Sequence, residues 1–439
     1  MKNIKFKVIY TLCLLATIVM SCNKDDFSQP ESSMELYDAS VSTTIPIEEA
    51  LSSLDQLMGE LYGKTRSSAS SYTVDVFGGI KTKSGEVELP DTSLYIVNFG
   101  DKEGYAVLSA QSKVQTKVFC ITESGFIAPE DIRNAIIKMS DSTVTTKGGD
   151  VEDEEYFAEY GRGFVPAIIA SSLLNQLLYD YEIEDDDCET KANMYVGTPN
   201  TSAMLETKWT QSSPFNDFRS DGAPAGCVAI ATAQIIEFNA LKHDYDSFVE
   251  DKYKTFDWNL LSKVCHYSNL YNNKVDSAAL KEASDFLYYI GLKKNCNIKY
   301  GADGSSGWAD GAKRTFNNMG YKSVKKYLGF EKADKNRAIS QLTSGFPMYM
   351  DGSGPDGGHA FVLDGLYTRK VYGENGDYMR TENMFHINWG WRGQDDGYYS
   401  QGVFDTSKRV DTESGIDPGS VSQPYSKYTW NYRTITYSL

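Results

Sequence analysis

The chain has little of what metal, redox and nucleic-acid sites are built from. Its 439 residues include four histidines and seven cysteines, and no two cysteines have the Cys-x-x-Cys spacing of zinc sites and redox motifs. Basic residues are also few, because 43 Lys and Arg against 60 Asp and Glu give a formal net charge of −17. That charge argues against nucleic acid as the main partner. Low-complexity tracts and internal repeats are absent too, so we expect a folded, soluble body with no cofactor and no metal.

Long apolar runs are absent beyond the N-terminus. There, three lysines precede the apolar segment 8–20, which is followed by a small residue, Ser21. A charged region, an apolar region and a small residue before a cleavage point are typical of an export signal. The segment is too short for a membrane span. The pattern therefore predicts a signal peptide over residues 1–21 and an exported protein.

The next residue, Cys22, indicates how the exported protein is anchored. A small residue followed by cysteine resembles a bacterial lipoprotein signal, in which Cys22 becomes the lipidated first residue. Residues 23–26, Asn-Lys-Asp-Asp, resemble the acidic tag of lipoproteins sent to the outer cell surface. The alternative is ordinary secretion, with Cys22 incidental. We expect a tether over 22–44 and an outer-membrane or cell-surface location, with membrane contact only through the lipid, or release from it.

The rest of the chain mixes helical and strand patterns. Apolar residues at helical spacing predict helices over 47–62, 129–138, 164–181, 227–238 and 277–291. Runs bounded by turn residues predict strands over 72–77, 93–98, 105–109, 114–121, 347–350, 360–363, 384–388, 397–401 and 429–437. The fold class predicted from these patterns is α+β, with a helical half that contains Cys227 and a strand-rich half beyond residue 345.

Between these parts lie stretches without either pattern. Residues 143–155 look like a loop, and 182–189 form an acidic run. Residues 191–201 look irregular and exposed, so we expect a linker that a protease can cut, within 184–203. Such a cut would separate a region over 45–190 from a domain over 191–439.

One cysteine stands where its chemistry would change. Small residues over 222–226 precede Cys227, and a mostly apolar helical pattern follows it. A helix start offers unpaired N–H groups and the positive end of the helix dipole, which favour the reactive thiolate. The small residues would keep the sulfur uncovered. The alternative is a buried cysteine that packs as a small hydrophobe.

The remaining cysteines beyond the signal are not obviously paired. Cys120, Cys188, Cys265 and Cys296 together with Cys227 make an odd number, so at least one thiol is free. A disulfide between Cys265 and Cys296 is one interpretation if the protein is in an oxidising environment. Isolated thiols in the core are the reading that we favour.

His359 is the candidate base for Cys227. It follows two glycines at the start of a predicted strand, where we expect an imidazole exposed at a sheet edge. A cysteine nucleophile needs a base that holds it as the thiolate and later protonates the leaving amine, and histidine has the pKa for both tasks. The separation of 132 residues from Cys227 is typical of such pairs. We interpret His243, His266 and His386 as structural.

Three further residues are candidates to support this pair. Asn388 ends a predicted strand, so its side chain can accept a hydrogen bond from the far ring nitrogen of His359 and fix the tautomer. Asp364 is the rival, but five residues place it on the opposite strand face from His359, so Asn388 is preferred. The N–H of Cys227 is one expected oxyanion donor, and Gln211 in a turn-rich stretch upstream is the other.

Four motifs follow one another within residues 205–405: Trp209-Thr-Gln211, Gly226-Cys227-Val-Ala, Gly-Gly-His359-Ala-Phe-Val and His-Ile-Asn388-Trp-Gly-Trp. Together they resemble the streptopain family of papain-like cysteine peptidases. The resemblance implies a papain-like two-lobe fold, with the cysteine on a helical lobe and the histidine on an antiparallel β lobe. It also implies endopeptidase activity on proteins or peptides, with Cys227 as nucleophile, His359 as base, Asn388 as orienter and Gln211 as oxyanion donor.

The same resemblance extends to a substrate pocket and a propeptide. Residues 300–308 resemble a Gly/Ser loop at the pocket for the second residue before the cut. Ser306, Gly358 and Trp389 would line that pocket and favour an apolar substrate residue; an ordinary surface loop is the alternative. Residues 36–190 resemble the family's propeptide, which we assign to 45–190 as an α+β pro-domain. The resemblance thus implies a zymogen that its own propeptide inhibits.

Two functions of other classes stay open. A Cys/His/Asn site can transfer an acyl group to an amine instead of water, which would make the protein a cross-linking transferase. A surface tether can also display a binding or adhesion module on which the site is silent.

Overall fold

The computed structural model describes residues 44–69, 71–82, 85, 87–100, 102–140, 163–178, 192–243, 256–266, 275–302, 304–354, 357–373, 375–404 and 430–439. The predicted signal peptide, Cys22, residues 22–43 of the tether, the loop 143–155, the acidic run and Cys188 lie outside these residues. We call residues 44–178 the N-terminal region and residues 192–439 the C-terminal region. No helix in the described part is both long and apolar enough to cross a membrane.

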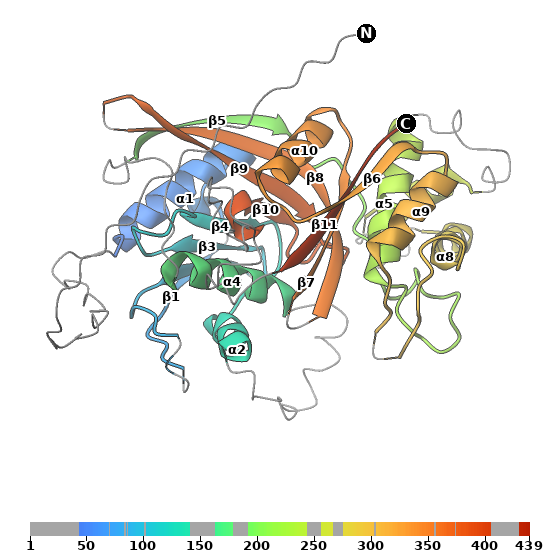
Figure 1. Ribbon diagram of the computed structural model, residues 1–439, viewed down its shortest axis with the longest axis horizontal. Coiled ribbons are helices and arrows are strands. Elements are labelled where there is room, and N and C mark those ends of the chain that lie inside the picture. The colour runs from blue at the N-terminus through green and yellow to red at the C-terminus, as the bar shows by residue number, and fades with distance from the viewer. Residues whose placement is uncertain are drawn as a thin grey trace, which may run out of the picture. The chain divides into compact units, whose positions relative to one another are not determined.

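One antiparallel sheet extends through both regions (Figure 1). In spatial order its strands are β1 (Tyr72–Phe77), β2 (Leu94–Phe99), β3 (Tyr105–Ser109), β4 (Val118–Thr122), β10 (Gly397–Ser400), β9 (Tyr378–Asn388), β8 (Gly357–Gly373), β7 (Met348–Gly354), β11 (Asn431–Ser438) and β6 (Lys322–Leu328). A further strand, β5 (Ala192–Thr201), pairs with β8 beside this path.

The two regions join where β4 pairs with β10. The antiparallel register places Thr122 opposite Gly397 and Cys120 opposite Tyr399. Strands β2, β3 and β4 are buried along their whole length, so the seam lies inside the protein. Backbone hydrogen bonds therefore hold the N-terminal region against the C-terminal region, besides any contact between side chains.

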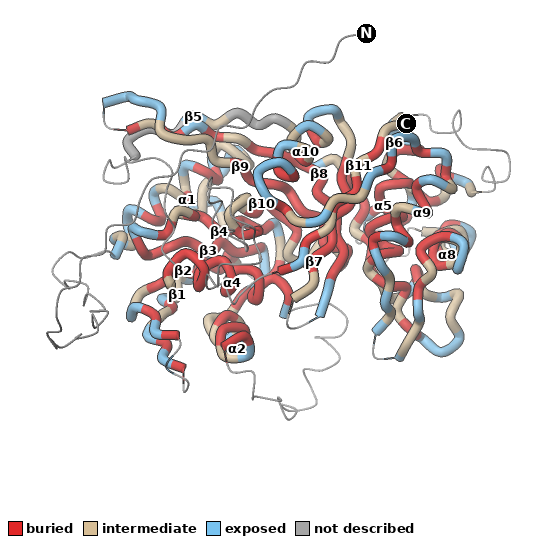
Figure 2. Tube along the Cα trace, in the orientation of Figure 1, coloured by how far each residue is buried: buried red, intermediate tan, exposed pale blue. Residues whose placement is uncertain are grey.

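The helices of the N-terminal region cover the two faces of its strands. Helix α1 (Ile47–Tyr62) buries one apolar stripe and ends at Gly63, whose φ of 65° suits glycine. Helices α2 (Pro129–Ser140) and α4 (Phe164–Leu178) pack on each other. Their apolar side chains belong to a hydrophobic core different from the one that α1 covers. Figure 2 shows α4 buried along its length, which explains why its sequence is apolar on all sides.

Most helices of the C-terminal region pack around α5 (Cys227–Lys242), which itself contacts β7 and β8. The others are α6 (Trp258–Ser262), α8 (Ser277–Gly291), α9 (Ala309–Asn318) and α10 (Lys332–Thr343), and short 3-10 turns occur at η1 (Arg66–Ser68) and η4 (Gln401–Phe404). Helix α5 lies at the centre of the helical lobe and contacts α6, α8, α9 and the strands β7 and β8. A helical lobe against an antiparallel sheet confirms the predicted α+β class.

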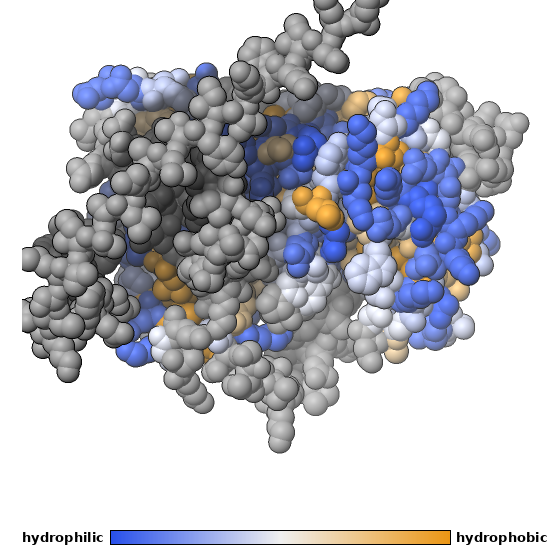
Figure 3. All heavy atoms as spheres, in the orientation of Figure 1, coloured by the Kyte–Doolittle hydropathy of each residue, from blue (hydrophilic) through white to orange (hydrophobic). Residues whose placement is uncertain are grey.

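The surface of the edge strand β6 carries charged side chains. The edge strand β6 carries Lys322 and Lys325 exposed to solvent. Charged side chains on an edge strand disfavour pairing with another chain. The described part of the face in Figure 3 is largely hydrophilic, with few apolar side chains in view.

Residues 191–201 correct the prediction of an irregular linker. From Ala192 to Thr201 the chain forms β5, which pairs with β8 from Gly373 to Leu366. The prediction failed because Gly197 and Pro199 are unusual in strands. It also failed because β5 forms through its pairing with β8, a distant strand that a local sequence pattern does not reveal.

Candidate active site

Cys227 is the first residue of α5, where the sequence places it. The preceding Gly226 has a φ of 92°, and its carbonyl accepts the backbone N–H of Ile230 at 3.1 Å. Because the C=O and N–H of one peptide unit point in opposite directions, the N–H of Cys227 points out of the helix start. A donor in that position suits a developing oxyanion.

The thiol of Cys227 is not ionised in this arrangement. Burial raises its pKa and the charge of Asp351 raises it further, while the backbone N–H of Ala360 acts in the opposite direction. The donors at the helix start, which favour the thiolate, are therefore not enough to lower the pKa of Cys227 in this arrangement. Loss of solvation outweighs the donors at the helix start.

Gln211 lies next to the loop that leads into Cys227. Its backbone carbonyl accepts the N–H of Ala225 at 2.8 Å, two residues before the cysteine. The side chain is half-buried and forms no hydrogen bond with any described residue. The structure thus brings Gln211 and Cys227 together, although they are 16 residues apart.

His359 lies in β8 but not at an exposed edge. Only 7% of its surface is accessible, so the expectation of an exposed imidazole is wrong. Neighbouring residues of β8 show which way it faces: Ala360 packs in the core of α5, whereas Phe361 packs in the core of α4. Since side chains alternate along a strand, His359 shares the face of Phe361 and points away from Cys227. No hydrogen bond or ion pair joins Cys227 and His359 among the described residues.

Aromatic rings enclose the imidazole of His359. The ring centroid of Trp391 lies 4.4 Å away, and that of Phe164, the first residue of α4, lies 5.7 Å away. The Nε2 atom is 2.8 Å from the carbonyl oxygen of Trp389 and so donates to it. Burial lowers the pKa of His359 to about 4, against the opposing effect of this carbonyl. We call this position of His359, against Phe164 and away from Cys227, the latent arrangement.

Asn388 is buried, and its side chain bonds other groups. Its Nδ2 donates to the carbonyl of Thr207 at 2.7 Å. Its Oδ1 accepts from Nε2 of Gln234 and from the N–H of Gly390, both at 3.0 Å. Both lone pairs of the oxygen are thus in use, and Asn388 can orient His359 only after one of these donors has been exchanged.

Asp364 is also engaged elsewhere. One carboxylate oxygen is 2.6 Å from Nδ1 of His386, and the other accepts the N–H of Leu205 at 3.0 Å. Burial alone would lower the pKa of His386, but Asp364 and Glu123 raise it to about 10, so this imidazole is charged. The Nε2 atom of His386 is 3.4 Å from Glu123, which belongs to the N-terminal region. His386 is therefore structural, as predicted, and it links the two regions.

The predicted pocket residues do not share one open surface. Ser306 is exposed and exchanges backbone hydrogen bonds with Lys299 at 2.8 and 2.9 Å. Gly358 is exposed as well, whereas Trp389 is fully buried, with its indole stacked on Trp391 at 5.3 Å. In the latent arrangement Trp389 lines no groove, and its place in the pocket stays a prediction.

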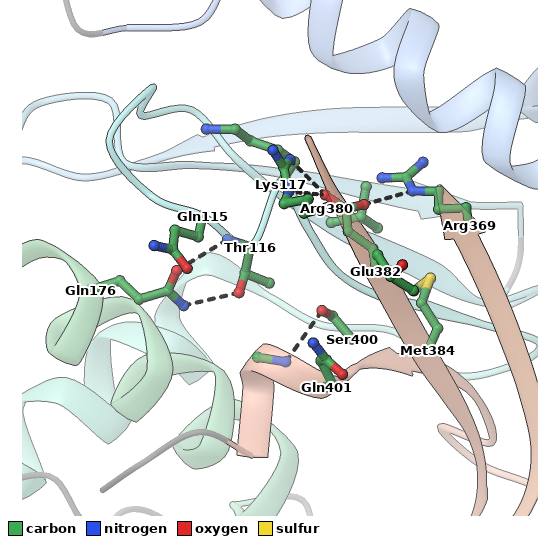
Figure 4. Close-up of a pocket in the computed structure, with 13 residues that line it drawn as sticks. Gln115, Thr116, Lys117, Gln176, Arg369, Arg380, Glu382, Met384, Ser400 and Gln401 are labelled. Atoms are coloured by element: carbon green, nitrogen blue, oxygen red, sulfur yellow. Dashed lines mark hydrogen bonds and ion pairs between the residues drawn. The ribbon is translucent and has the colours of Figure 1, made fainter. Parts of the chain in front are cut away.

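A separate cavity lies between the two regions (Figure 4). It has a volume of about 100 Å³, and its lining includes Gln176 of α4 and Glu382 of β9. Glu382 forms ion pairs at 2.6 Å with Arg369 and Arg380. None of the predicted site residues lines this cavity.

The buried cysteines of the described chain are free thiols. Cys120, Cys265 and Cys296 form no disulfide, which confirms the prediction of isolated core thiols. Sγ of Cys265 donates to the carboxyl group of Glu237 at 3.1 Å. Cys296 lies against two threonine hydroxyls, at 3.3 and 3.7 Å. None of these thiols stands at a helix start like that of Cys227.

Phe164 is the contact that the sequence did not indicate. Its place in an apolar helix was predicted, but an apolar helix gives no sign of which single ring covers an imidazole 195 residues later. The only local signal is its place at the N-terminal end of α4, where a large ring can project beyond the helix.

The sequence profile of the Peptidase C10 family matches residues 209–399. Streptopain from Streptococcus pyogenes is 27% identical over 245 residues, which cover 47% of this chain and 58% of streptopain. The thiol protease/hemagglutinin PrtT of Porphyromonas gingivalis is 22% identical over 413 residues, which cover 85% of this chain and 42% of that protein.

Among solved structures, a Prevotella intermedia prointerpain A fragment matches with a TM-score of 0.48 and 18% identity, over 83% of this chain and 98% of the fragment. The matched part of the chain thus spans 58% of streptopain and 42% of PrtT. The segment 209–399 contains Gln211, Cys227, His359 and Asn388.

Proposed function

Because the sequence profile of the Peptidase C10 family matches the segment that contains Cys227 and His359, we propose that the chain is a cysteine endopeptidase made as a zymogen, with residues 45–190 as its propeptide. The proposed nucleophile is Cys227 and the proposed base is His359. The observation that carries the zymogen proposal is the contact between His359 and Phe164 of the N-terminal region. The proposed base is buried by the propeptide on the strand face away from the nucleophile.

The proposed reaction follows from the groups around Cys227. In the active form His359 takes the thiol proton, and the thiolate sulfur attacks the carbonyl carbon of the scissile peptide bond. The N–H of Cys227 and the side chain of Gln211 stabilise the oxyanion, while Asn388 holds the far ring nitrogen of His359. The imidazolium then protonates the leaving amine, and a water molecule deprotonated by His359 hydrolyses the acyl-enzyme.

The pKa shifts of Cys227 and His359 support the proposal that the enzyme is inactive in the latent arrangement. The pKa of Cys227 is raised and that of His359 is lowered, so both groups are neutral at neutral pH. A thiolate and an imidazolium stabilise each other only when they are close. Departure of Phe164 would open the aromatic enclosure and let the imidazole turn toward the sulfur. The pair would then ionise at neutral pH.

The activation cut is proposed within residues 184–203, and pairing of β5 favours its N-terminal part. From Ala192 onward the backbone is bonded to β8, and a paired strand resists entry into a protease cleft. A cut before Ala192 would leave β5 attached to the active enzyme.

Specificity and location are proposed from the sequence. An apolar substrate residue is proposed at the second position before the cut, beside Ser306 and Gly358, both of which are exposed. The protein is proposed to be exported and anchored through lipidated Cys22, at the outer membrane or cell surface.

A peptidyl epoxide and an added amine together test this function against its rivals. We expect the epoxide to label Cys227 slowly in the full-length protein and at least about tenfold faster once the N-terminal region has been cut off, because the sulfur then has its base. Mass spectrometry of the labelled peptide measures this. A peptide substrate incubated with excess amine should give products that have gained water.

The other outcomes point to other functions. Products that have gained the amine would indicate a transferase. A Cys227 that remains unlabelled after the cut would indicate a silent site on an adhesion module. Either result would contradict the proposal of a hydrolase.

A further inference from the structure

One peptide unit near Cys227 is held at both of its ends. Its carbonyl, that of Pro224, accepts the hydroxyl of Ser305 at 2.6 Å. Its N–H, that of Ala225, donates to the carbonyl of Gln211 at 2.8 Å. Because a peptide unit is planar, two bonds at opposite ends fix both its place and its tilt.

The nucleophile follows this unit with only Gly226 between them. A Cβ at Gly226 would lie 3.2 Å from Cγ2 of Ile298 and 3.5 Å from Cβ of Ser305, so the backbone fits closely against this neighbouring segment. The direction of the Cys227 N–H, the proposed oxyanion donor, is therefore set by the fixed peptide unit and one constrained glycine. A displacement of the unit would displace the sulfur and the donor together.

The segment that carries Ser305 is itself well anchored. Ser306 pairs with Lys299 through backbone hydrogen bonds at 2.8 and 2.9 Å. Gly307 lies so close to Val228 that a Cβ at position 307 would be 3.1 Å from the valine Cβ. The hydroxyl of Ser305 thus projects from a segment that is fixed directly after it, at Ser306 and Gly307.

We propose that Ser305 is a positioning residue of the peptidase. Through the Pro224–Ala225 unit, its hydroxyl sets the geometry between Cys227 and Gln211 and connects both to the segment of Ser306. This inference rests on the proposed function, because it assigns Ser305 to the same site. Ser305 touches no reacting atom; it acts through the backbone before the nucleophile.

A second side chain, that of Asn216, also forms hydrogen bonds with the loop before Cys227 and provides a matched comparison for Ser305. The side-chain N–H₂ of Asn216 donates to the carbonyls of Gly222 and Ala223 at 3.1 and 3.3 Å. These carbonyls are further from Cys227 along the chain than that of Pro224. Loss of the Asn216 bonds should therefore disturb the nucleophile less than loss of the Ser305 bond.

The test compares Ser305→Ala, Ser305→Thr and Asn216→Ala in the full-length chain after self-processing, with active enzyme counted by epoxide labelling. We expect Ser305→Ala to lower kcat about tenfold with KM changed less than about twofold, as for one lost hydrogen bond at the reacting geometry. Ser305→Thr keeps the hydroxyl and should stay within about twofold of wild type. Asn216→Ala should lie between the two.

The pH profile of iodoacetamide alkylation of Cys227 separates positioning from general stability. For Ser305→Ala it should move to higher pH, because the thiolate loses its placed donors, while the melting temperature stays within a few degrees. An unchanged kcat and alkylation profile would overturn the inference. Equal losses in the alanine and threonine variants would also overturn it. Wild-type protein without Cys227 labelling and without casein cleavage would instead reject the proposed function.

Discussion

Replacement of Cys227 with alanine should leave the precursor at full length and abolish casein cleavage. Without the sulfur no acyl-enzyme forms, and loss of a peptidase nucleophile lowers kcat by about 10⁶-fold. The fold should persist, because the thiol is half-buried and its removal leaves the Gly226–Ile230 hydrogen bond intact. Timed gel analysis of the purified precursor and a casein assay measure both effects in one incubation.

Cys296→Ser is the matched control for this prediction. Cys296 is a buried thiol of the same lobe, and its sulfur lies 3.3 Å from the hydroxyl of Thr315, a contact that serine can keep. This variant should process and cleave casein like wild type. A Cys227→Ala protein that still digests casein would place the nucleophile elsewhere and contradict the proposed mechanism.

Replacement of Phe164 with alanine should weaken latency. The ring of Phe164 lies 4.8 Å from Trp430 and 5.7 Å from both His359 and Trp389, measured between centroids. Loss of a buried phenylalanine costs about 3–5 kcal/mol. Because Phe164 is buried only in the latent arrangement, its loss destabilises that arrangement relative to the released state. About a third of that cost already changes the equilibrium tenfold. Epoxide labelling of Cys227 in the still uncut precursor should therefore accelerate about tenfold or more.

Phe77→Ala separates release of His359 from general loosening of the N-terminal region. Phe77 is 1% exposed in β1, and its ring lies beside Arg133. It belongs to the same core as Phe164 but has no ring contact with His359 among the described residues. This variant should destabilise the N-terminal region by a similar amount with little acceleration of labelling. Equal acceleration in both variants would show that Phe164 has no special role.

Local sequence patterns were enough to predict many elements. The bounds of α1, α8, β1 and β3 match the predicted ranges, and α5 begins at the predicted residue. These elements have a clear period or a turn at each end, and their signals lie within a few residues.

Other elements depend on distant partners and were missed. Strand β5 and the full length of β8 are set by their mutual pairing, and β6 is a polar edge strand beside β11. Helices α9 and α10 were not predicted either, because they are short and carry many polar residues. The pairing of β4 with β10 joins residues more than 270 positions apart, and no local pattern encodes it.

In the candidate site, the position of Cys227 could be predicted from local sequence, whereas that of His359 could not. The place of Cys227 at a helix start follows from the glycine before it and the apolar residues after it. The position of His359 does not follow from its own motif, because Phe164 and the strand face decide it. The motif predicts which residue is the base but not whether that base is in place.

The depressed pKa of His359 also gives latency a pH dependence. In the latent arrangement the pKa is about 4, against an ordinary value of 6.5. In Cys227→Ala protein, where no thiolate pairs with the released imidazole, His359 is neutral above pH 6.5 whether buried or released, so pH has no effect there. As pH falls from 6.5 to 4, only the released imidazole takes up a proton, and the latent arrangement loses about 3 kcal/mol relative to release.

The most direct measurement of the central claim is the titration of His359 by NMR in full-length Cys227→Ala protein, with the resonance assigned by its loss in His359→Gln. If the propeptide holds the imidazole among Phe164, Trp389 and Trp391, the measured pKa will be about 4. A measured pKa near 6.5 in the full-length protein would mean that His359 is solvated before any cut, and would contradict the latent arrangement.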